Sequence, residues 1–262
     1  MDTIIVATDL SERSDRTVDR ALRLAETTGA TCHVVSVTDD ALPMALADQM
    51  SEAVEEHIRK ALQGRSDRIK TEVTILRGDV AEMLIRYAML HDADLIVLGL
   101  HRRRMLLDTL RETTMTRIVA ASQTPVLLVK NDVSGDYTNA LVPVSFSPSC
   151  AGAVLSTKKV APSAKVTSFH ALKRAADEEG ALEANAKWME EQRLTSVMDA
   201  PEIILGGLRK TLKQKLKENA PDLLAIGAHT RSGLSLQKLG SFAAELVRDP
   251  PVDLLISHPI DE

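Results

Sequence analysis

The chain has 262 residues, two cysteines and a formal net charge of −5 at pH 7. This length predicts one or two globular domains, and the acidic balance disfavours a general nucleic-acid-binding protein. The cysteines, Cys32 and Cys150, lie far apart and form no CxxC motif. We therefore interpret both as reduced thiols of a cytoplasmic protein, rather than as a metal or redox pair.

No segment approaches the roughly 20 consecutive apolar residues that a membrane-spanning helix requires. The amino-terminal stretch, residues 1–9, has no basic region and only a short apolar run, which is unlike a signal peptide. We expect no membrane association and a cytoplasmic location.

The first half alternates short apolar runs, typical of buried strands, with amphipathic stretches, typical of helices. Strands are predicted over residues 3–8, 31–37, 71–76, 94–98 and 125–129. Helices are predicted over residues 14–27, 45–63, 78–90 and 113–122. The turn-rich segment 131–139 then predicts a linker.

The second half repeats this order. Strands are predicted over residues 140–144, 165–171, 202–205, 223–226 and 252–256. Helices are predicted over residues 154–160, as a shortened first helix, and over 175–196, 207–219 and 241–248. Strands that alternate with helices predict right-handed βαβ units and a parallel sheet covered on both faces.

A sequence motif is repeated as well. Asp94-Leu-Ile-Val-Leu-Gly99 returns as Asp222-Leu-Leu-Ala-Ile-Gly227, a shift of 222 − 94 = 128 residues. A repeat at half the chain length predicts two copies of one domain. We assign residues 1–130 to the first domain, 131–139 to the linker and 140–262 to the second domain.

The loop after the fourth strand of the second half has the features of a phosphate site. Gly227 ends that strand and Gly240-Ser241 opens a helix 240 − 227 = 13 residues later. Backbone amides at a helix N-terminus bind anions, and a glycine there allows close approach. We expect the backbone freedom of Gly240 to matter most. Ligands of such sheets bind at the carboxyl ends of the strands, where the strand order reverses.

Several motifs are specific enough to compare with a known family. They are Val6-Ala-Thr-Asp9, Gly78-Asp-Val-Ala-Glu82 and Thr124-Pro-Val-Leu-Leu-Val129 in the first half, and Ile226-Gly-Ala-His-Thr-Arg-Ser-Gly-Leu-Ser235 and Leu239-Gly-Ser241 in the second. Over nearly the whole chain they resemble the universal stress protein family, as two tandem copies. The resemblance implies an α/β fold of two five-stranded parallel-sheet sandwiches, of the adenine nucleotide alpha hydrolase type. Some members bind ATP through a glycine, two residues, a glycine, nine residues and Gly-Ser or Gly-Thr, and others bind no nucleotide.

The resemblance implies that the second copy is the better nucleotide site. The implied contacts come from two loops and a strand end: Pro143, Val144, Ser145, Ala171, Gly227, Thr230, Gly240, Ser241 and Phe242. The phosphates would lie on the amides of the last three residues and the base beside Ala171. Thr230 replaces the middle glycine of the family pattern, and the strand-one loop with Ser145 lacks the family's acid.

The first copy carries a degenerate version of the site. Its matching residues are Asp9, Val37, Gly99, Arg102, Glu112 and Thr113. Arg102 replaces the middle glycine, and Glu112-Thr113 replaces the closing Gly-Ser. The carboxylate of Glu112 would take the place of a phosphate at a helix N-terminus. We expect Arg102 and Glu112 to form a salt bridge that plugs this site; the alternative is that both side chains point into solvent.

The leading hypothesis is a non-catalytic, tandem stress-response protein whose candidate ligand is ATP. Its two halves would pack as a pseudo-dimer, with a homodimer of tandem chains and an unidentified protein partner as further expectations. The rival within this fold is an interaction protein that works without a nucleotide.

The rival of another class is a nucleotidyl-transfer or pyrophosphatase enzyme. That class generally needs a Ser-Gly-Gly-type loop after the first strand, whereas the two loops here read Asp9-Leu-Ser-Glu12 and Ser145-Phe-Ser-Pro148. We predict no catalytic residue. We also predict no metal site, because His101 and His229, one in each copy, have no clustered His or Cys partners.

Overall fold

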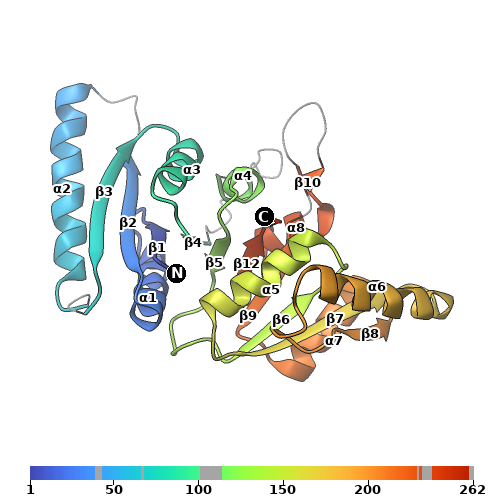
Figure 1. The fold of residues 1–262 in the computed structure, drawn as a ribbon. Coiled ribbons are helices and arrows are strands. Elements are labelled where there is room, and N and C mark those ends of the chain that lie inside the picture. The colour runs from blue at the N-terminus through green and yellow to red at the C-terminus, as the bar shows by residue number, and fades with distance from the viewer. Residues whose placement is uncertain (39–42, 66–67, 101–113, 229, 232–237, 260–262) are drawn as a thin grey trace. The chain divides into compact units, whose positions relative to one another are not determined.

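The computed structural model describes residues 1–38, 43–65, 68–100, 114–228, 230–231 and 238–259. The chain divides into two compact units, residues 1–135 and 136–262 (Figure 1). Each unit is an α/β domain built on five parallel strands. The predicted fold class of two tandem parallel-sheet domains is therefore confirmed.

The first unit carries its strands in the order β3-β2-β1-β4-β5. The strands are β1 (Thr3–Ala7), β2 (Thr31–Thr38), β3 (Thr71–Arg77), β4 (Leu95–Gly99) and β5 (Val126–Val129), and all pairs between neighbours are parallel. Its helices are α1 (Glu12–Thr28), α2 (Met44–Leu62), α3 (Val80–Leu90) and α4 (Thr114–Ala121). Helix α1 packs on β1 and β4, α2 packs on β3, and α3 packs beside α4.

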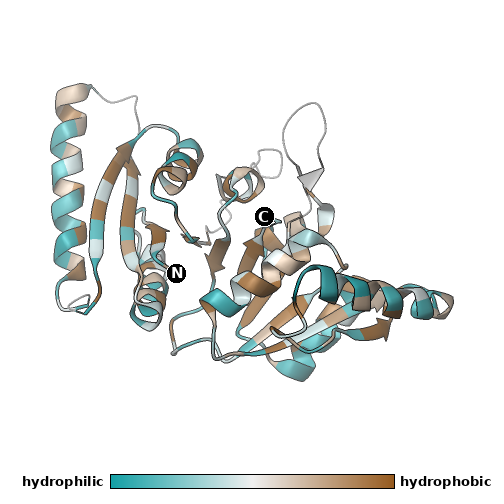
Figure 2. Ribbon diagram, in the orientation of Figure 1, coloured by the Kyte–Doolittle hydropathy of each residue, from teal (hydrophilic) through white to brown (hydrophobic). Residues whose placement is uncertain are grey.

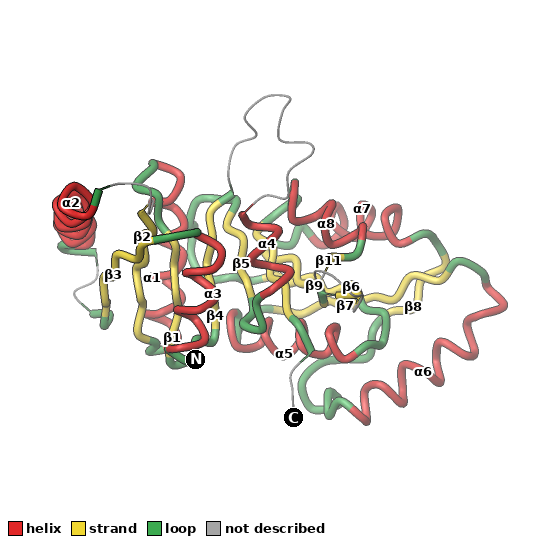
Figure 3. The backbone as a smooth tube through the Cα atoms, turned by 90° about the horizontal axis from the view of Figure 1, so that it is seen from above, coloured by secondary structure: helices red, strands yellow, loops and turns green. Residues whose placement is uncertain are grey.

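The second unit repeats this topology in the order β12-β9-β6-β7-β8. The strands are β6 (Asn139–Pro143), β7 (Lys165–Leu172), β8 (Glu202–Leu205), β9 (Leu223–Gly227) and β12 (Asp253–Ser257). The helices are α5 (Pro148–Val160), η1 (Ala175–Asp177), α6 (Glu178–Glu191), α7 (Leu208–Asn219) and α8 (Ser241–Arg248). Figure 3 shows α5 and α6 on one side of these strands and α7 and α8 on the other.

Strands β1, β4, β5, β6 and β9 are almost continuously apolar, and Figure 2 shows brown stretches in the strands and more teal in the helices. Parallel strands are buried on both faces and therefore lack the alternation of half-buried strands. Fully buried side chains come from β1, β4 and β5 of the first unit and from β6, β9 and β12 of the second: Ile4, Ile5, Leu95, Ile96, Leu127, Leu141, Leu223, Leu254 and Ile256. This explains why β-branched apolar runs locate the strands so well in the sequence.

The repeated aspartate immediately before the fourth strand of each copy has a structural role. Asp94 Oδ2 accepts hydrogen bonds from the backbone N–H groups of Asp2 (2.6 Å) and Thr3 (3.3 Å). Asp222 does the same in the second unit, where its carboxylate accepts from the N–H groups of Thr138 (2.7 Å) and Asn139 (3.0 Å). The carboxylates therefore satisfy the backbone at the start of the neighbouring first strand, β1 or β6.

Two predicted helices of the second unit are wrong in extent. Helix α5 begins at Pro148, not near 154, because the Ser147 side chain caps it and proline occupies its first turn. Its small residues are buried on all sides, so its start lacks the amphipathic stripe that indicates a helix. Helix α6 ends at Glu191, not at 196, because Arg193 adopts a left-handed conformation (φ 52°) and turns the chain.

The loop after β9 contains a short hairpin that the sequence did not predict. Strand β10 (Thr230–Arg231) pairs antiparallel with β11 (Lys238–Leu239), just before helix α8. The hairpin brings the chain from the end of β9 to the N-terminus of α8.

An ion pair joins the third and fourth helices of each unit. In the first unit Asp79, the N-cap of α3, pairs with Arg117 of α4. In the second unit Arg209 of α7 pairs with Glu245 of α8 at 2.7 Å. Arg117 and Glu245 are 245 − 117 = 128 residues apart, which is the repeat shift, and they carry opposite charges; their partners, Asp79 and Arg209, are 209 − 79 = 130 residues apart at the starts of α3 and α7.

Candidate functional site

The candidate site of the second unit lies where the strand order reverses. Strand β6 pairs with β7 on one side and with β9 on the other. The chain leaves β6 and β9 in opposite directions along the sheet, so the loops that follow them begin at the same carboxyl edge, where ligands of such sheets bind. These two loops contain most of the residues predicted to bind a nucleotide.

The loop after β6 is a tight turn. Pro143 ends the strand, and the Val144 N–H donates to the Phe169 carbonyl of β7 at 2.9 Å. Ser145 is exposed, and its Oγ lies 3.4 Å from Ser147 Oγ. Phe146 adopts a left-handed backbone conformation (φ 56°) immediately before Ser147 caps helix α5.

The first unit makes the same turn with different side chains. Leu10 has φ 62° and precedes Ser11, which caps α1. Asp9 stands where the second unit has Ser145, and its Oδ1 accepts hydrogen bonds from the Ser11 N–H (3.1 Å) and Ser11 Oγ (2.6 Å). The acid that the second copy lacks therefore stabilises the turn in the first copy.

The other residues of the first, degenerate site are described only in part. Val37 is half-buried in β2 and Gly99 ends β4. Arg102, Glu112 and Thr113 lie outside the described residues, and with them the predicted salt bridge between Arg102 and Glu112. That plug stays a prediction.

Gly227 has a packing reason to be glycine. A Cβ atom at this position would lie 2.5 Å from the backbone carbon of Ser149 and 2.6 Å from the Cys150 nitrogen. The first turn of α5 therefore rests directly on the end of β9, and only glycine permits this approach. This close contact holds the two loops of the candidate site together.

The N-terminus of α8 has no side-chain cap of its own. Gly240 is its N-cap and offers no side-chain hydrogen bond to the first turn. Ser241 is exposed, and Gly240 and Phe242 are half-buried. Because the first N–H groups of a helix have no partner within it, the amides of Ser241 and Phe242 can serve an anion.

The expected need for backbone freedom at Gly240 is wrong. Its φ of −59° and ψ of 150° are accessible to every residue type. What glycine supplies here is an uncapped helix end without a side chain. A substitution would act by filling the anion position or by changing its charge.

Sequence reasoning missed an aromatic cluster beside this site. The Phe146 ring stacks on His170 of β7, with centroids 4.3 Å apart and an interplanar angle of 24°. The Trp188 ring of α6 lies 5.8 Å from that of Phe146, and its Nε1–H donates to the Ser147 carbonyl at 3.0 Å. The available signal was the presence of the chain's single tryptophan in a polar helix.

A protein-family match is found separately in each of the two units. The family model described as "Universal stress protein family" matches the chain twice, over residues 1–130 and 136–258. The chain belongs to the universal stress protein family. It holds two tandem copies of the family domain, one in each unit.

Relatives of this universal stress protein include both sequences and solved structures. A 109-residue stretch is 30% identical to "Universal stress protein A homolog 1" of Coxiella burnetii, covering 37% of this chain and 75% of that protein. A universal stress protein from Archaeoglobus fulgidus superposes with a TM-score of 0.75 at 20% identity, covering 98% of each chain. A putative universal stress protein from Pseudomonas aeruginosa gives a TM-score of 0.67 at 15% identity, covering 99% of this chain and 94% of that one. The two structures share the tandem fold.

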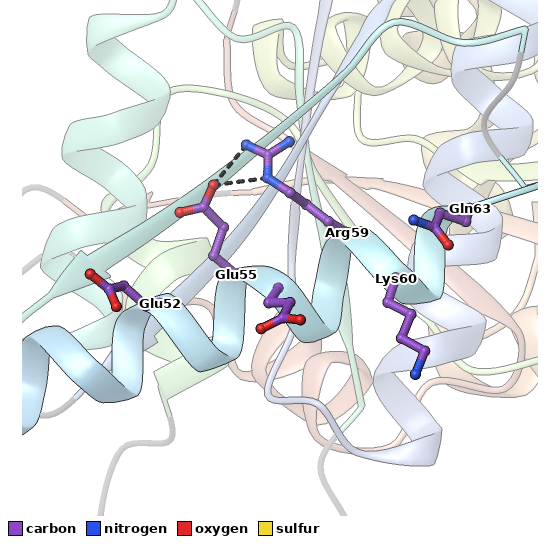
Figure 4. A pocket seen from close by; sticks show the side chains of 6 residues that line it. Glu52, Glu55, Arg59, Lys60 and Gln63 are labelled. Atoms are coloured by element: carbon purple, nitrogen blue, oxygen red, sulfur yellow. Dashed lines mark hydrogen bonds and ion pairs between the residues drawn. The ribbon is translucent and has the colours of Figure 1, made fainter.

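A surface hollow on this universal stress protein is not the candidate site. Its lining comes from one helix, α2, and is charged or polar throughout: Glu52, Glu55, Glu56, Arg59, Lys60 and Gln63 (Figure 4). Arg59 pairs there with Glu55, one turn away, at 2.7 Å. No strand end contributes to it, so we interpret it as the solvated face of an amphipathic helix.

The two histidines expected to have no metal-binding partners, His101 and His229, lie outside the described residues. Among the residues that are described, no group of three His, Cys, Asp or Glu side chains is arranged to hold a metal ion. Within that same part of the chain, none of the helices has the length and apolarity to cross a bilayer.

Proposed function

We propose that this tandem universal stress protein is a non-catalytic, cytoplasmic stress-response protein that binds ATP in its second unit. The observation that carries the proposal is the uncapped N-terminus of α8 at Gly240, on the loop that follows β9. Amides at such a helix end favour a phosphate group.

The neighbouring residues support the same placement. At the end of β6, Pro143 and Val144 are buried and Ser145 is exposed, and half-buried Ala171 lies near the end of β7. A triphosphate on the amides of Gly240, Ser241 and Phe242 would leave the base on the β6 and β7 side. Thr230, at the start of β10, precedes the helix end on the same loop.

Calorimetric titration of the full chain with ATP tests the proposal. Mass spectrometry of small molecules released from the purified protein by denaturation is the companion measurement. We expect saturable binding with one ATP per chain, because only the second copy retains the closing Gly-Ser. Two equivalent sites would contradict the assignment to the second unit.

The rival proposal is a nucleotide-independent interaction protein of the same fold. The absence of ATP binding by the wild-type chain, with no released nucleotide, would favour it. Its partner would then be sought by cross-linking in extracts of stressed cells. The pseudo-dimer of the two halves and a homodimer of tandem chains stay predictions, which sedimentation analysis of the full chain tests.

A further inference from the structure

We propose that Phe146 and His170 form an aromatic wall on which the base of the bound nucleotide stacks, held in place by Trp188. This inference rests on the proposed function, because it concerns the same site. It adds the determinant that selects a ligand with an aromatic base over one that offers only phosphates.

The position of the wall follows from its neighbours. Phe146 comes directly after Ser145, and His170 directly before Ala171, which are the residues expected to flank the base. Their side chains join the end of β7 to the loop after β6. The two rings thus lie at the carboxyl ends of β6 and β7, beside the residues that the proposed function places next to the base.

Burial shows which side of the cluster is open. Trp188 is only 4% exposed, whereas Phe146 and His170 are both half-buried. Trp188 is therefore the inner member and the Phe146–His170 stack is the solvent-facing one. An aromatic surface that is still partly exposed can bury further area against a nucleobase, which presents a flat π-face of its own.

Hydrogen bonds fix the wall before a ligand arrives. A carbonyl oxygen can only accept, so the 2.9 Å contact between His170 Nδ1 and the Val144 carbonyl places a proton on Nδ1. The Trp188 indole N–H donates to the carbonyl of Ser147, three residues further along the same turn. The turn that carries Phe146 is thus tied to β7 on one side and to α6 on the other, so little ordering remains to be done on binding.

The first unit shows that the turn does not require aromatic side chains. Leu10 occupies the same left-handed position as Phe146. Strand β1 pairs with β2 in the same register as β6 pairs with β7, so Ser36 of the first unit is the equivalent of His170. Helix α2 of the first unit has 19 residues and packs on β3, whereas α6 has 14 and sends Trp188 to the β6 loop. The wall is a feature of the unit that keeps the closing Gly-Ser.

The test compares ATP with inorganic tripolyphosphate, which lacks a base. The variant is Phe146→Leu, since leucine already occupies this backbone conformation in the first unit. The matched control is Leu10→Ala at the equivalent turn of that unit. We expect Phe146→Leu to weaken ATP binding about tenfold, as loss of a base-stacking partner does, and to leave tripolyphosphate binding unchanged. Leu10→Ala should change neither.

A second measurement needs no variant. Trp188 is the only tryptophan of the chain, so its fluorescence reports on the wall directly. ATP should change its emission, and tripolyphosphate at saturating concentration should not.

The outcomes separate this inference from the proposed function. If the wild-type chain binds no ATP, the proposed function fails and the wall with it. If the wild type binds ATP but Phe146→Leu binds it equally well and the Trp188 emission stays constant, the site stands and the wall is refuted.

Discussion

Arg117 clamps Asp79 with two parallel hydrogen bonds, from Nη1 to Oδ2 at 2.9 Å and from Nη2 to Oδ1 at 3.0 Å. Asp79 also accepts the Glu82 N–H at 3.0 Å and so caps helix α3. One carboxylate therefore caps the N-terminus of α3 and also joins this helix to its neighbour α4. The Arg117 guanidinium and the Glu82 N–H hold the pKa of Asp79 below its ordinary value.

The Asp79 clamp predicts a pH-dependent contribution to stability. A lowered folded-state pKa gives stabilisation that is present above the ordinary carboxyl pKa of about 3.9 and is lost as the pH falls through the folded-state value. Asp79→Asn keeps a good helix cap but removes the charge, so it should cost under about 1 kcal/mol at pH 7, since the pair is half-exposed. Urea unfolding at pH 7 and below pH 3 checks this. A cost that persists at low pH would show that the charge is not the cause.

The close approach at Gly227 predicts a large effect of a single methyl group. Gly227→Ala should destabilise the second unit by about 1–3 kcal/mol, because the new Cβ would overlap the Ser149 backbone. Gly180→Ala in α6 is the matched control: nothing lies within 4 Å of its added Cβ, so it should be neutral or stabilising by up to about 1 kcal/mol. Urea unfolding of both variants measures the difference. Equal stabilities would mean that α5 can move away from β9.

The open end of α8 predicts that charge, more than bulk, controls ATP binding. Asp and Asn are equally good helix caps, so Gly240→Asp and Gly240→Asn should fold alike. The aspartate would place a negative charge where the phosphates are proposed to lie, and we expect at least tenfold weaker ATP binding than for the asparagine variant. Calorimetric titration of the two variants gives this ratio. A ratio near one would show that the phosphates do not bind at this helix end.

A buried histidine predicts acid sensitivity of the first unit. His33 is 5% exposed, its Nδ1 lies 3.0 Å from Tyr87 Oη, and burial lowers its pKa, with His91 and Lys70 acting in the same direction and Glu72 opposing. Below about pH 6.5 the unfolded chain gains a proton that the folded unit resists, so stability should fall as the pH drops from 7 to 5. His33→Gln should reduce that fall. Unfolding curves at both pH values provide the check, and identical slopes for variant and wild type would assign the acid sensitivity elsewhere.

The fold could be predicted because its signals are local. Runs such as residues 4–6 and 254–256 are apolar because they lie inside a parallel sheet, and the Asp94 and Asp222 motifs repeat at a fixed shift. The start of α5 was missed because its small, wholly buried residues show no amphipathic period.

The candidate site was harder to predict because its contacts are not local. The Trp188 indole bonds to Ser147, in the loop of Phe146, although the two residues are 41 positions apart in the sequence. No spacing in the sequence indicates that contact. Gly227 and Gly240 were both predicted to be site residues, but their different roles are seen only in the structure. Gly227 must be glycine because α5 packs directly on it. Gly240 begins α8 without a side chain that could cap the helix.

The exchanged charges of the two cross-helix ion pairs bear on how a chain with two homologous halves avoids folding into the wrong combination. Helices α4 and α8 occupy equivalent places, so either could in principle dock on the other copy's sheet while the chain folds, a characteristic failure of repeated domains. If α8 took the place of α4, Glu245 would meet Asp79, and if α4 took the place of α8, Arg117 would meet Arg209. Both substitutions bring like charges together where the native pairings bring opposite ones. A misdocked last helix would therefore lose a native attraction of about 0–1 kcal/mol, the usual value for a half-exposed pair, and meet a like charge instead.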